Sequence, residues 1–280
     1  MSGLKKVKKA IKPVYNTGKY IRYKTEGILA KHHVYLNGNI KKLASYQDKH
    51  KGERVFLIGT GPSLKAEDLD LLKDEYSIGC NMVYKIYSQT SWRPTYHCVT
   101  DRNYGIRLSE ELSQKVTVPF FVPKSTYVRM KQHPQNSIWI SDIYDQDIYE
   151  VTGDMLSYCR VQGTVMGFMI ELAIFMGFEE IYLLGVDCTS SFQAKGHFVK
   201  DYVPENLNKE NEQRLKEDGN LTKEQAAAKS IDRSIAAYEI IQEFVTRTKK
   251  AKVYNATRGG ALEVFPRVCL DDVLGKGEKL

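Results

Sequence analysis

The sequence predicts an α/β fold: a Rossmann-like, mostly parallel sheet flanked by helices, preceded by a basic N-terminal helical extension. From Gly52 onward, short apolar runs alternate with longer stretches of helical periodicity, which is typical of parallel strands joined by helical crossovers. Several of these runs end in glycine-rich or polar clusters. Ligands bind at the carboxyl ends of the strands in open parallel sheets, so these clusters are the candidate site residues.

The bulk composition is that of a folded, intracellular protein. The 280 residues are 42% hydrophobic and 27% charged, which allows a sizeable core. The five cysteines are scattered and form no Cys-x-x-Cys pair, so we expect reduced thiols in a cytoplasmic protein and no metal site. We see no signal peptide, and the longest apolar zone, around residues 165–178, is too short and interrupted to span a membrane.

The basic character belongs to residues 1–50, which we expect to be an extension of a catalytic domain at residues 51–280. Residues 1–50 contain eleven lysines and one arginine against two acidic residues, a net charge of +10. The whole chain carries +7, so the remainder sums to −3. Leu4, Val7, Ile11 and Val14 recur at helical spacing among the lysines, and Pro13 is expected to limit the first helix.

A basic amphipathic segment of this kind binds anionic membrane surfaces, which would place the protein peripherally at the inner membrane face. An acidic partner, a solvated tail and a helix packed on the domain are the alternatives. Nucleic acid is not an expected partner, because the body is slightly acidic and has no basic patch interleaved with aromatic residues.

Seven strands and five helices are expected in the domain. The expected strands are Arg54–Ile58, Ser77–Cys80, Thr95–Val99, Val118–Val122, Ser137–Ile140, Ile181–Leu184 and Lys252–Tyr254. The expected helices are Ala66–Leu72, Arg107–Gln114, Thr126–Gln132, Thr164–Met176 and Lys223–Lys249. The long polar stretch 189–222 is interpreted as a lid or binding loop, with a surface insertion as the alternative.

The first candidate site is the turn Gly59-Thr60-Gly61-Pro62-Ser63, which directly follows a predicted strand. Its glycines allow backbone amides to approach a ligand without obstruction by side chains. Ser63 is expected to cap the next helix, whose N-terminus favours an anion. The turn is therefore a candidate phosphate site, and ordinary strand-to-helix topology is the alternative.

Polar side chains follow the next two strands. Asn81 offers both a donor and an acceptor to a base or a ribose, or else occupies a turn. Asp101 and Asn103 follow the third strand. Asp101 is a candidate metal ligand, sugar-orienting group or helix cap, and Asn103 is a candidate nucleotide contact.

Asp187 and His197 form the candidate catalytic pair. Asp187 ends a strongly apolar strand, and His197 lies ten residues further along. A histidine titrates near neutral pH, which suits a general base that activates a hydroxyl. Asp187 would orient this base or hold the substrate. Solvent exposure without a function is the alternative for a loop histidine.

Two further clusters complete the set of candidates. Gly163 and Thr164 precede an apolar helix, where Thr164 fits an N-cap and the free amides offer a second anion site. Thr257 follows the last strand, and with the adjacent Gly259 and Gly260 it is expected to close over the nucleotide.

The stretches FLIGTGPSL, GCNMVY and EEIYLLGVD resemble the bacterial CMP-sialic-acid-dependent sialyltransferases, which have a modified Rossmann fold. The resemblance implies a CMP-sugar-binding role for Gly59, Thr60, Gly61, Pro62, Ser63 and Asn81. The family has Asn between its two glycines, where this chain has Thr60. It places its catalytic histidine downstream of the Gly-x-Asp strand, and His197 is the only histidine after His133.

With VTDRNYG and NATRGGALEVFPRV, these stretches are still more similar to the MptE-like domain, over about residues 52–274. That family is named for an archaeal 6-hydroxymethylpterin diphosphokinase, and many members look like components of surface-polysaccharide synthesis. The pterin enzyme would show an Asp-x-Asp-Gly signature for Mg-ATP, where this chain reads Thr100-Asp101-Arg102-Asn103. A single carboxylate is a poor ligand set for Mg²⁺ on a triphosphate.

The expected function is therefore glycosyl transfer from a nucleotide-activated sugar, with a CMP-linked donor favoured, to a glycan acceptor in bacterial surface-polysaccharide synthesis. His197 is the expected general base, Asp187 or Asp101 positions a substrate, and no tightly bound cofactor is expected. A Mg-ATP-dependent 6-hydroxymethylpterin diphosphokinase, with Asp101 as the Mg²⁺ ligand, is the runner-up. A nucleotide-binding protein without catalysis is the third alternative.

Overall fold

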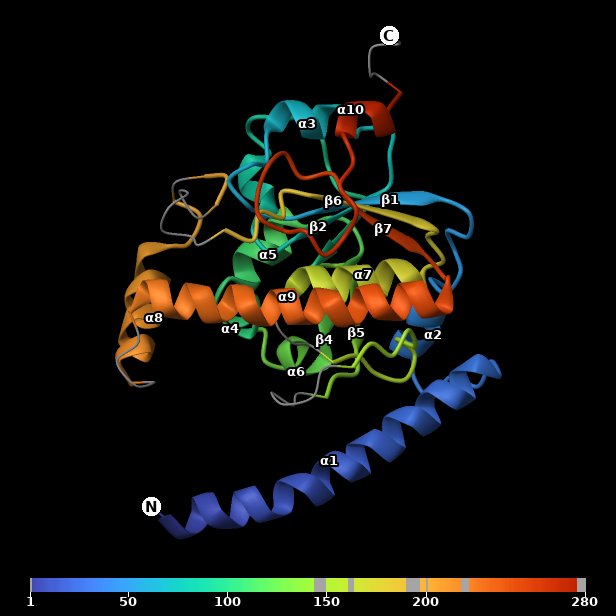
Figure 1. Cartoon of the computed structure of the whole chain (residues 1–280). Helices are drawn as coiled ribbons and strands as arrows, with labels where there is room; N and C mark the ends of the chain where they lie inside the picture. The colour runs from blue at the N-terminus through green and yellow to red at the C-terminus, as the bar shows by residue number, and fades with distance from the viewer. Residues whose placement is uncertain are drawn as a thin grey trace.

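A seven-stranded parallel sheet forms the centre of the computed structural model (Figure 1). The structure describes residues 2–143, 150–160, 164–189, 197–199, 201–217 and 222–275. All seven predicted strands are confirmed, with ends that shift by at most two residues. They are β1 (Arg54–Ile58), β2 (Ser77–Cys80), β3 (Tyr96–Cys98), β4 (Phe120–Pro123), β5 (Ser137–Ile140), β6 (Glu180–Leu184) and β7 (Lys252–Asn255).

The strand order β5-β4-β3-β2-β1-β6-β7 gives the sheet one topological switch point. The chain builds the sheet outward from β1 to β5 and then crosses back to place β6 beside β1. The connections that leave β1 and β6 therefore diverge, and a crevice opens between the carboxyl ends of these two strands. β1 and β6 pair along their full lengths, so both strands end at the same level.

Helices cover both faces of the sheet (Figure 1). On one face lie α3 (Ala66–Asp70) and α10 (Leu270–Val273), and on the other lie α7 (Val165–Phe175) and α9 (Lys223–Thr248). The alternation along β1 explains this arrangement, because Val55 and Leu57 pack with α7 and α9 while Phe56 and Ile58 pack with α3 and α10. All four are fully buried, as expected for a strand in the middle of a parallel sheet.

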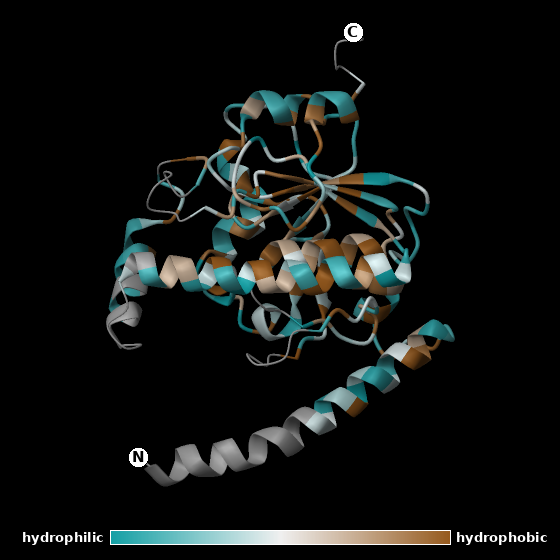
Figure 2. Ribbon diagram, in the orientation of Figure 1, coloured by the Kyte–Doolittle hydropathy of each residue, from teal (hydrophilic) through white to brown (hydrophobic). Residues whose placement is uncertain are grey.

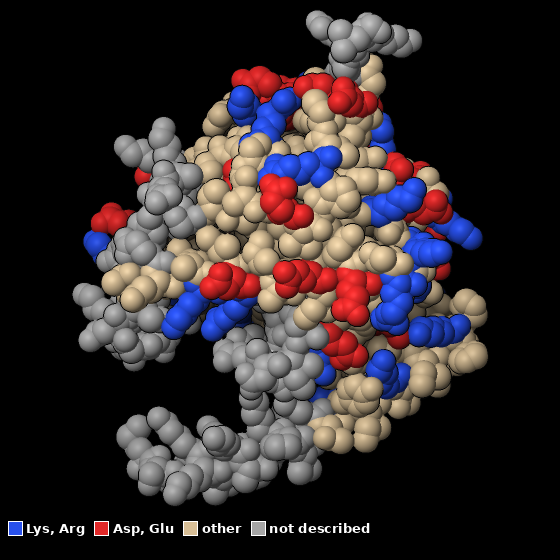
Figure 3. All heavy atoms as spheres, viewed as in Figure 1, with Lys and Arg blue, Asp and Glu red and all other residues tan. Residues whose placement is uncertain are grey.

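Shorter helices complete the two layers. η1 (Val83–Ile86) follows β2, α4 (Arg102–Arg107) and α5 (Ser109–Lys115) follow β3, and α6 (Lys124–Tyr127) follows β4. α2 (Gly38–Ala44) precedes β1 and packs against β5 at the edge of the sheet. Figure 3 shows lysine, arginine and acidic side chains interspersed over one face of the molecule.

α1 (Ser2–Lys31) runs along the outside of the domain, and its C-terminal part docks on residues 150–160 (Figure 1). Tyr23 packs in a buried cluster with Ile143 and Tyr158. Lys31 Nζ lies 2.7 Å from Asp154 Oδ2. This part of α1 is therefore a helix packed on the domain, which was one of the alternatives to membrane binding.

Three helical predictions were wrong in detail. α1 continues through Pro13, because a long helix tolerates the loss of one backbone hydrogen bond by bending locally. The helix predicted from Arg107 begins at Arg102, and it breaks at Leu108 into α4 and α5. The helix predicted at residues 126–132 is the single turn α6, since the amides of Arg129 and Met130 bond three residues back rather than four.

The polar stretch 189–222 contains a helix, α8 (Glu205–Glu217). Within the described part of the stretch, Tyr202 and Leu207 are buried. Lys85 Nζ donates to the backbone carbonyls of Asp201 and Tyr202, at 2.8 Å each. The segment is therefore tied to the domain at Tyr202, and its action as a lid stays a prediction.

Hydrophobic residues gather where α7 meets the sheet, whereas the described part of α1 is largely hydrophilic (Figure 2). Among the helices that the structure describes, none has the length and apolarity needed to cross a membrane. The five cysteines are free thiols; Cys80, Cys98 and Cys159 are buried, Cys188 is half-buried and Cys269 is exposed.

Glu171 places a carboxyl group inside the core. It lies on α7 with 1% of its surface exposed, and its Oε2 accepts from the Thr152 amide at 3.3 Å. Burial raises the pKa of Glu171 to about 8, because the charged form loses its hydration inside the protein.

The stability of the protein is expected to decrease as the pH rises from about 4.5 to about 8. Folded Glu171 keeps its proton over this range, while the unfolded side chain, with an ordinary pKa of 4.5, releases it. The variant Glu171→Gln resembles the protonated carboxyl and should lack this dependence. In thermal melts between pH 5 and pH 8, the wild-type Tm should fall by about 4 °C or more relative to the variant. Parallel Tm profiles would contradict the assignment.

Candidate functional site

The crevice at the switch point contains a pocket of about 190 Å³. Its floor is formed by the segments that follow β1 and β6, and its walls by the N-terminus of α7 and the N-terminal half of α9. The pocket brings together seven of the predicted site residues: Gly59, Thr60, Gly61, Pro62, Thr164, Asp187 and His197.

Asp187 joins three loops at the floor of this pocket. Its Oδ2 accepts from Ser63 Oγ at 2.9 Å, and its backbone carbonyl accepts from the Ala261 amide at 2.7 Å. Gly260, with φ of +76°, packs so closely on Asp187 that an added Cβ would collide with its backbone. The prediction that Ser63 caps α3 was wrong, because its hydroxyl binds Asp187 and the N-cap position of α3 is Lys65.

The two glycine amides of the turn bond to the segment at the end of β6 and do not point into the pocket as free donors. The Gly59 amide donates to the Leu184 carbonyl at 2.8 Å, and the Gly61 amide donates to the Gly185 carbonyl at 2.9 Å. A Cβ on Gly59 would collide with the Gly185 carbonyl, and one on Gly61 with the Asp187 carboxylate. These two amides are therefore already used within the protein.

Burial raises the pKa of Asp187 above its ordinary value, and the hydrogen bonds from Ser63 oppose this effect. The carboxylate faces the glycine turn, and the hydrogen-bond partner of His197 is Thr60 rather than Asp187. The structure thus gives Asp187 a positioning role for the turn, which the sequence pattern did not indicate.

His197 is held as a neutral base by the glycine turn and a tyrosine. The Thr60 carbonyl accepts from His197 Nδ1 at 3.1 Å and from the Phe198 amide at 3.2 Å. Because a carbonyl can only accept, this contact requires the proton on Nδ1, which also lies 3.3 Å from Thr60 Oγ1, and it leaves Nε2 with its lone pair. The imidazole stacks on Tyr202 with 3.8 Å between ring centroids, and the Tyr202 hydroxyl accepts from the Met82 amide. Burial lowers the pKa of His197 below its ordinary value of 6.5.

The N-terminus of α7 forms one wall. Thr164 is the N-cap, as predicted, and its Oγ1 accepts from the Met166 amide at 3.2 Å and lies 3.3 Å from the Tyr238 hydroxyl. α7 is buried along almost its entire length, so the positive end of its dipole is poorly screened by solvent. The N-cap is therefore confirmed, while the binding of an anion at this end of α7 stays a prediction. Gly163, the other predicted residue here, lies outside the described residues.

The facing wall comes from α9, whose contribution the sequence reasoning missed. Ser230, Ser234 and Tyr238 line the pocket at intervals of four residues, which places them on one side of the helix. The four-residue spacing of these polar side chains is visible in the sequence. No local sequence pattern, however, indicates that α9 lies beside the end of β1. Among the lining residues within the described ranges, Asp187 is the one carboxylate, and lysine and arginine are missing.

Five predicted site residues within the described ranges are not part of the pocket lining: Ser63, Asn81, Asp101, Asn103 and Thr257. Asp101 caps α4, where its Oδ1 accepts from the Asn103 amide at 2.8 Å. Thr257 is buried, and its Oγ1 accepts from the Val186 amide at 3.0 Å. Thr257 therefore supports the segment that follows β6.

Asn81 sits beside the pocket, adjacent to Cys80 in its lining. Its φ of +47° is a left-handed conformation that asparagine adopts more readily than most residues. The buried His97 Nε2 donates to the Asn81 backbone carbonyl at 2.9 Å. The side-chain Oδ1 of Asn81 is buried and has no hydrogen-bond partner in the structure. Unpaired buried acceptors are rare, so this oxygen is a candidate ligand contact.

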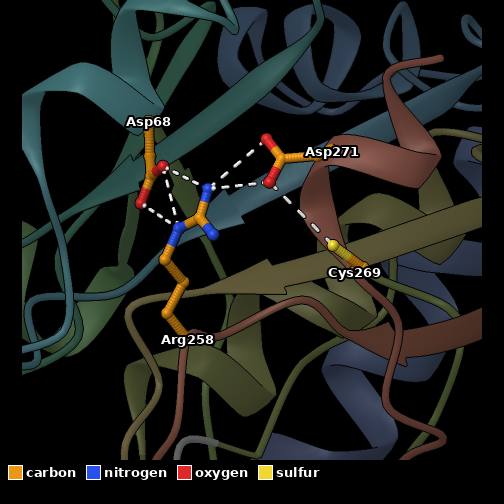
Figure 4. Close-up of polar contacts among 4 residues, drawn as sticks. All are labelled: Asp68, Arg258, Cys269 and Asp271. Carbon is orange, nitrogen blue, oxygen red and sulfur yellow. Dashed lines mark hydrogen bonds and ion pairs between the residues drawn. The ribbon is translucent and has the colours of Figure 1, made fainter. Parts of the chain in front are cut away.

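Arg258 anchors the segment that follows β7 (Figure 4). Its Nε lies 3.0 Å from both carboxylate oxygens of Asp68 on α3, and its Nη2 lies 3.4 Å from Asp271 on α10. This ion-pair network holds the corner at Gly260, which packs on Asp187.

The fold and the pocket define a doubly wound α/β protein with a candidate ligand site at its switch point. The family model described as 6-hydroxymethylpterin diphosphokinase MptE-like matches residues 29–192. The chain belongs to this MptE-like family, as its sequence motifs predicted. No curated protein matches the sequence.

Three solved structures are similar to this chain at low identity. The MAf glycosyltransferase from Magnetospirillum magneticum AMB-1 is 14% identical with a TM-score of 0.46; the match covers 83% of this chain but only 38% of that one. The sialyltransferase Cst-II in complex with CMP is 19% identical with a TM-score of 0.44, over 78% of this chain and 89% of that one. CstII from Campylobacter jejuni with the substrate analogue CMP-3FNeuAc is 18% identical with a TM-score of 0.43, over 77% and 86%.

An NMR titration of the histidine side chains should find the pKa of His197 below 6.5. In Tyr202→Leu, loss of the stacked ring admits water to the imidazole, so the pKa should move up toward 6.5. Tyr202→Phe keeps the ring and removes only the hydroxyl, so its titration should stay close to that of the wild type. Equal shifts in both variants would show that the stack does not control the titration of His197.

Proposed function

We propose that this protein transfers a sugar from a nucleotide-activated donor to a hydroxyl acceptor. The observation that carries the proposal is His197, an imidazole whose Nδ1 faces the Thr60 carbonyl, in a pocket whose polar lining includes hydroxyl groups of Thr164, Ser230, Ser234 and Tyr238 at and beside a helix N-terminus. Hydroxyl-rich walls suit a polyol, because each hydroxyl both donates and accepts hydrogen bonds.

Each wall then has a part in the reaction. The nucleotide phosphate lies at the N-terminus of α7, beside Thr164, and the sugar lies against Ser230 and Ser234 of α9. The acceptor oxygen attacks the anomeric carbon, and the bond to the phosphate breaks with its electron pair on the phosphate oxygen. His197 Nε2 takes the acceptor proton. The α7 dipole stabilises the charge that develops on the departing phosphate.

A CMP-linked donor is favoured by the sequence resemblance to the sialyltransferases. The unpaired Oδ1 of Asn81 supports a contact with a donor group of the nucleotide, such as an amino group of the base or a ribose hydroxyl. A glycan acceptor in bacterial surface-polysaccharide synthesis is proposed from the resemblance to the polysaccharide-type MptE-like members.

The family description makes Mg-ATP-dependent diphosphokinase activity the second candidate. Mg²⁺ on a triphosphate prefers several oxygen ligands. Asp187 is already bound by Ser63, and Asp101 caps α4 outside the pocket. Within the described part of the chain there is no group of three or more His, Cys, Asp or Glu side chains suited to a metal ion. The carboxylates near the pocket therefore make a poor ligand set for Mg²⁺, and this supports glycosyl transfer over the diphosphokinase.

A thermal-shift panel of nucleotides tests the choice between these functions. We expect CMP or CDP to raise the Tm, with stabilisation of about 2.7 kcal/mol at a ligand concentration of 100 Kd. ATP with Mg²⁺ should leave the Tm unchanged. Stabilisation by Mg-ATP alone would overturn the proposal in favour of the diphosphokinase.

The general base is tested by His197→Ala, with the exposed His133→Ala as the matched control. Release of CMP from CMP-linked sialic acid, or from whichever donor stabilises the protein, should fall by about 10²-fold or more in His197→Ala. The CMP-induced Tm shift should persist, because His197 acts on the acceptor. His133→Ala should retain wild-type turnover. Full turnover in His197→Ala would remove this residue from the mechanism.

A further inference from the structure

α1 has two apolar faces, and only one of them packs on the domain. Tyr23, Gly27 and Ala30 are buried on the docked face. Ile21 and Ile28 are 59% and 56% exposed. These two residues are seven positions apart, which is about two helical turns, so they share one side of the helix.

Exposed large hydrophobic residues concentrate in this part of the chain. Seven such residues occur where the structure describes side-chain exposure, and five of them fall between positions 20 and 36: Tyr20, Ile21, Ile28, Val34 and Leu36. The Tyr20 ring contacts Tyr158 of the domain. We name the other four, Ile21 and Ile28 on α1 and Val34 and Leu36 just after it, the free apolar surface. Exposed apolar side chains that gather in one segment, rather than singly over the surface, indicate a partner.

The surroundings of the free apolar surface are strongly basic. α1 contains eight lysines and one arginine against a single acidic residue, Glu26. Glu26 already pairs with Arg22, at 2.9 Å. The sequence also repeats the spacing of Ile21 and Ile28 upstream, at Val14 and Val7. A partner of this helix must therefore accept apolar side chains and a net charge of +8.

We propose that α1 docks through the free apolar surface on an anionic lipid membrane. Apolar side chains of such a helix enter the boundary between headgroups and acyl chains, while lysines extend their charged ends to the headgroup phosphates. Several cations near an anionic leaflet add electrostatic attraction to the apolar contact. The docked face keeps the enzyme body attached to the membrane-bound helix through Tyr23 and the Lys31–Asp154 ion pair.

A second copy of the chain fits this surface less well. The seven-residue spacing also suits a coiled coil, in which acidic and basic residues beside the apolar seam normally pair across the interface. Two copies of α1 would instead bring together two helices of charge +8 with no acidic side chain left to neutralise them. Charge complementarity therefore favours an anionic surface.

The test is sedimentation of the full-length protein with vesicles, in the absence of nucleotide. Vesicles of phosphatidylcholine with about 30% phosphatidylglycerol should bind the wild type, and pure phosphatidylcholine vesicles should bind it much less. The double variant Ile21→Glu, Ile28→Glu should bind anionic vesicles at least about tenfold more weakly. Val128→Glu, which changes a 63% exposed residue elsewhere on the domain, should bind like the wild type.

Equal sedimentation of the wild type and the double variant would overturn the proposal, as would failure of the wild type to bind anionic vesicles. Light scattering on the vesicle-free protein adds the remaining outcome: a dimer that the double variant abolishes would assign the surface to a second copy. Because no nucleotide is present, this result is independent of the proposed glycosyl transfer. Matching Tm values for the wild type and double variant establish that both are folded.

Discussion

The geometry of the site depends on Asp187, which lies three residues beyond the end of β6. Its carboxylate holds Ser63 of the turn after β1, and its backbone holds Ala261 after β7. Three loops that are distant in the sequence are thereby fixed on one another at the switch point of the sheet. Glycine is required at position 61 because any larger residue would collide with this carboxylate. A buried carboxylate is costly unless it is hydrogen-bonded, so the Ser63 contacts are also what makes it tolerable.

The fixed turn determines what the rest of the pocket does. The Gly59 and Gly61 amides bind the end of β6, so our proposal assigns the binding of the phosphate to the N-terminus of α7 instead. The Thr60 carbonyl, held in place by the same turn, selects the tautomer of His197 that leaves Nε2 unprotonated. One structural element thus positions the proposed base, while a different element receives the proposed leaving group.

The two parts of the chain that differ in net charge also differ in the role that we propose for them. The slightly acidic domain encloses a pocket whose described lining has one carboxylate, whereas the excess of basic over acidic residues is concentrated in the N-terminal segment that contains α1. The docked face of α1 is attached to the domain through Tyr23 and the Lys31–Asp154 ion pair. The free apolar surface remains available to a partner. Under our two proposals, α1 would bring the enzyme to a surface and the crevice would carry out the transfer.

The sequence alone determined the seven parallel strands, the family and the Thr164 cap, because apolar runs, glycine turns and caps are local patterns. It also indicated that Asp187 and His197 belong to the pocket, since both lie at or soon after a strand end. Tertiary structure alone decided that Ser63 binds Asp187, that Tyr202 stacks on His197, and that Ser230 and Ser234 face the turn after β1. It likewise decided that Asp101 and Thr257 support the backbone away from the pocket. These contacts join residues far apart in the chain, and their geometry depends on how loops pack after the sheet has formed.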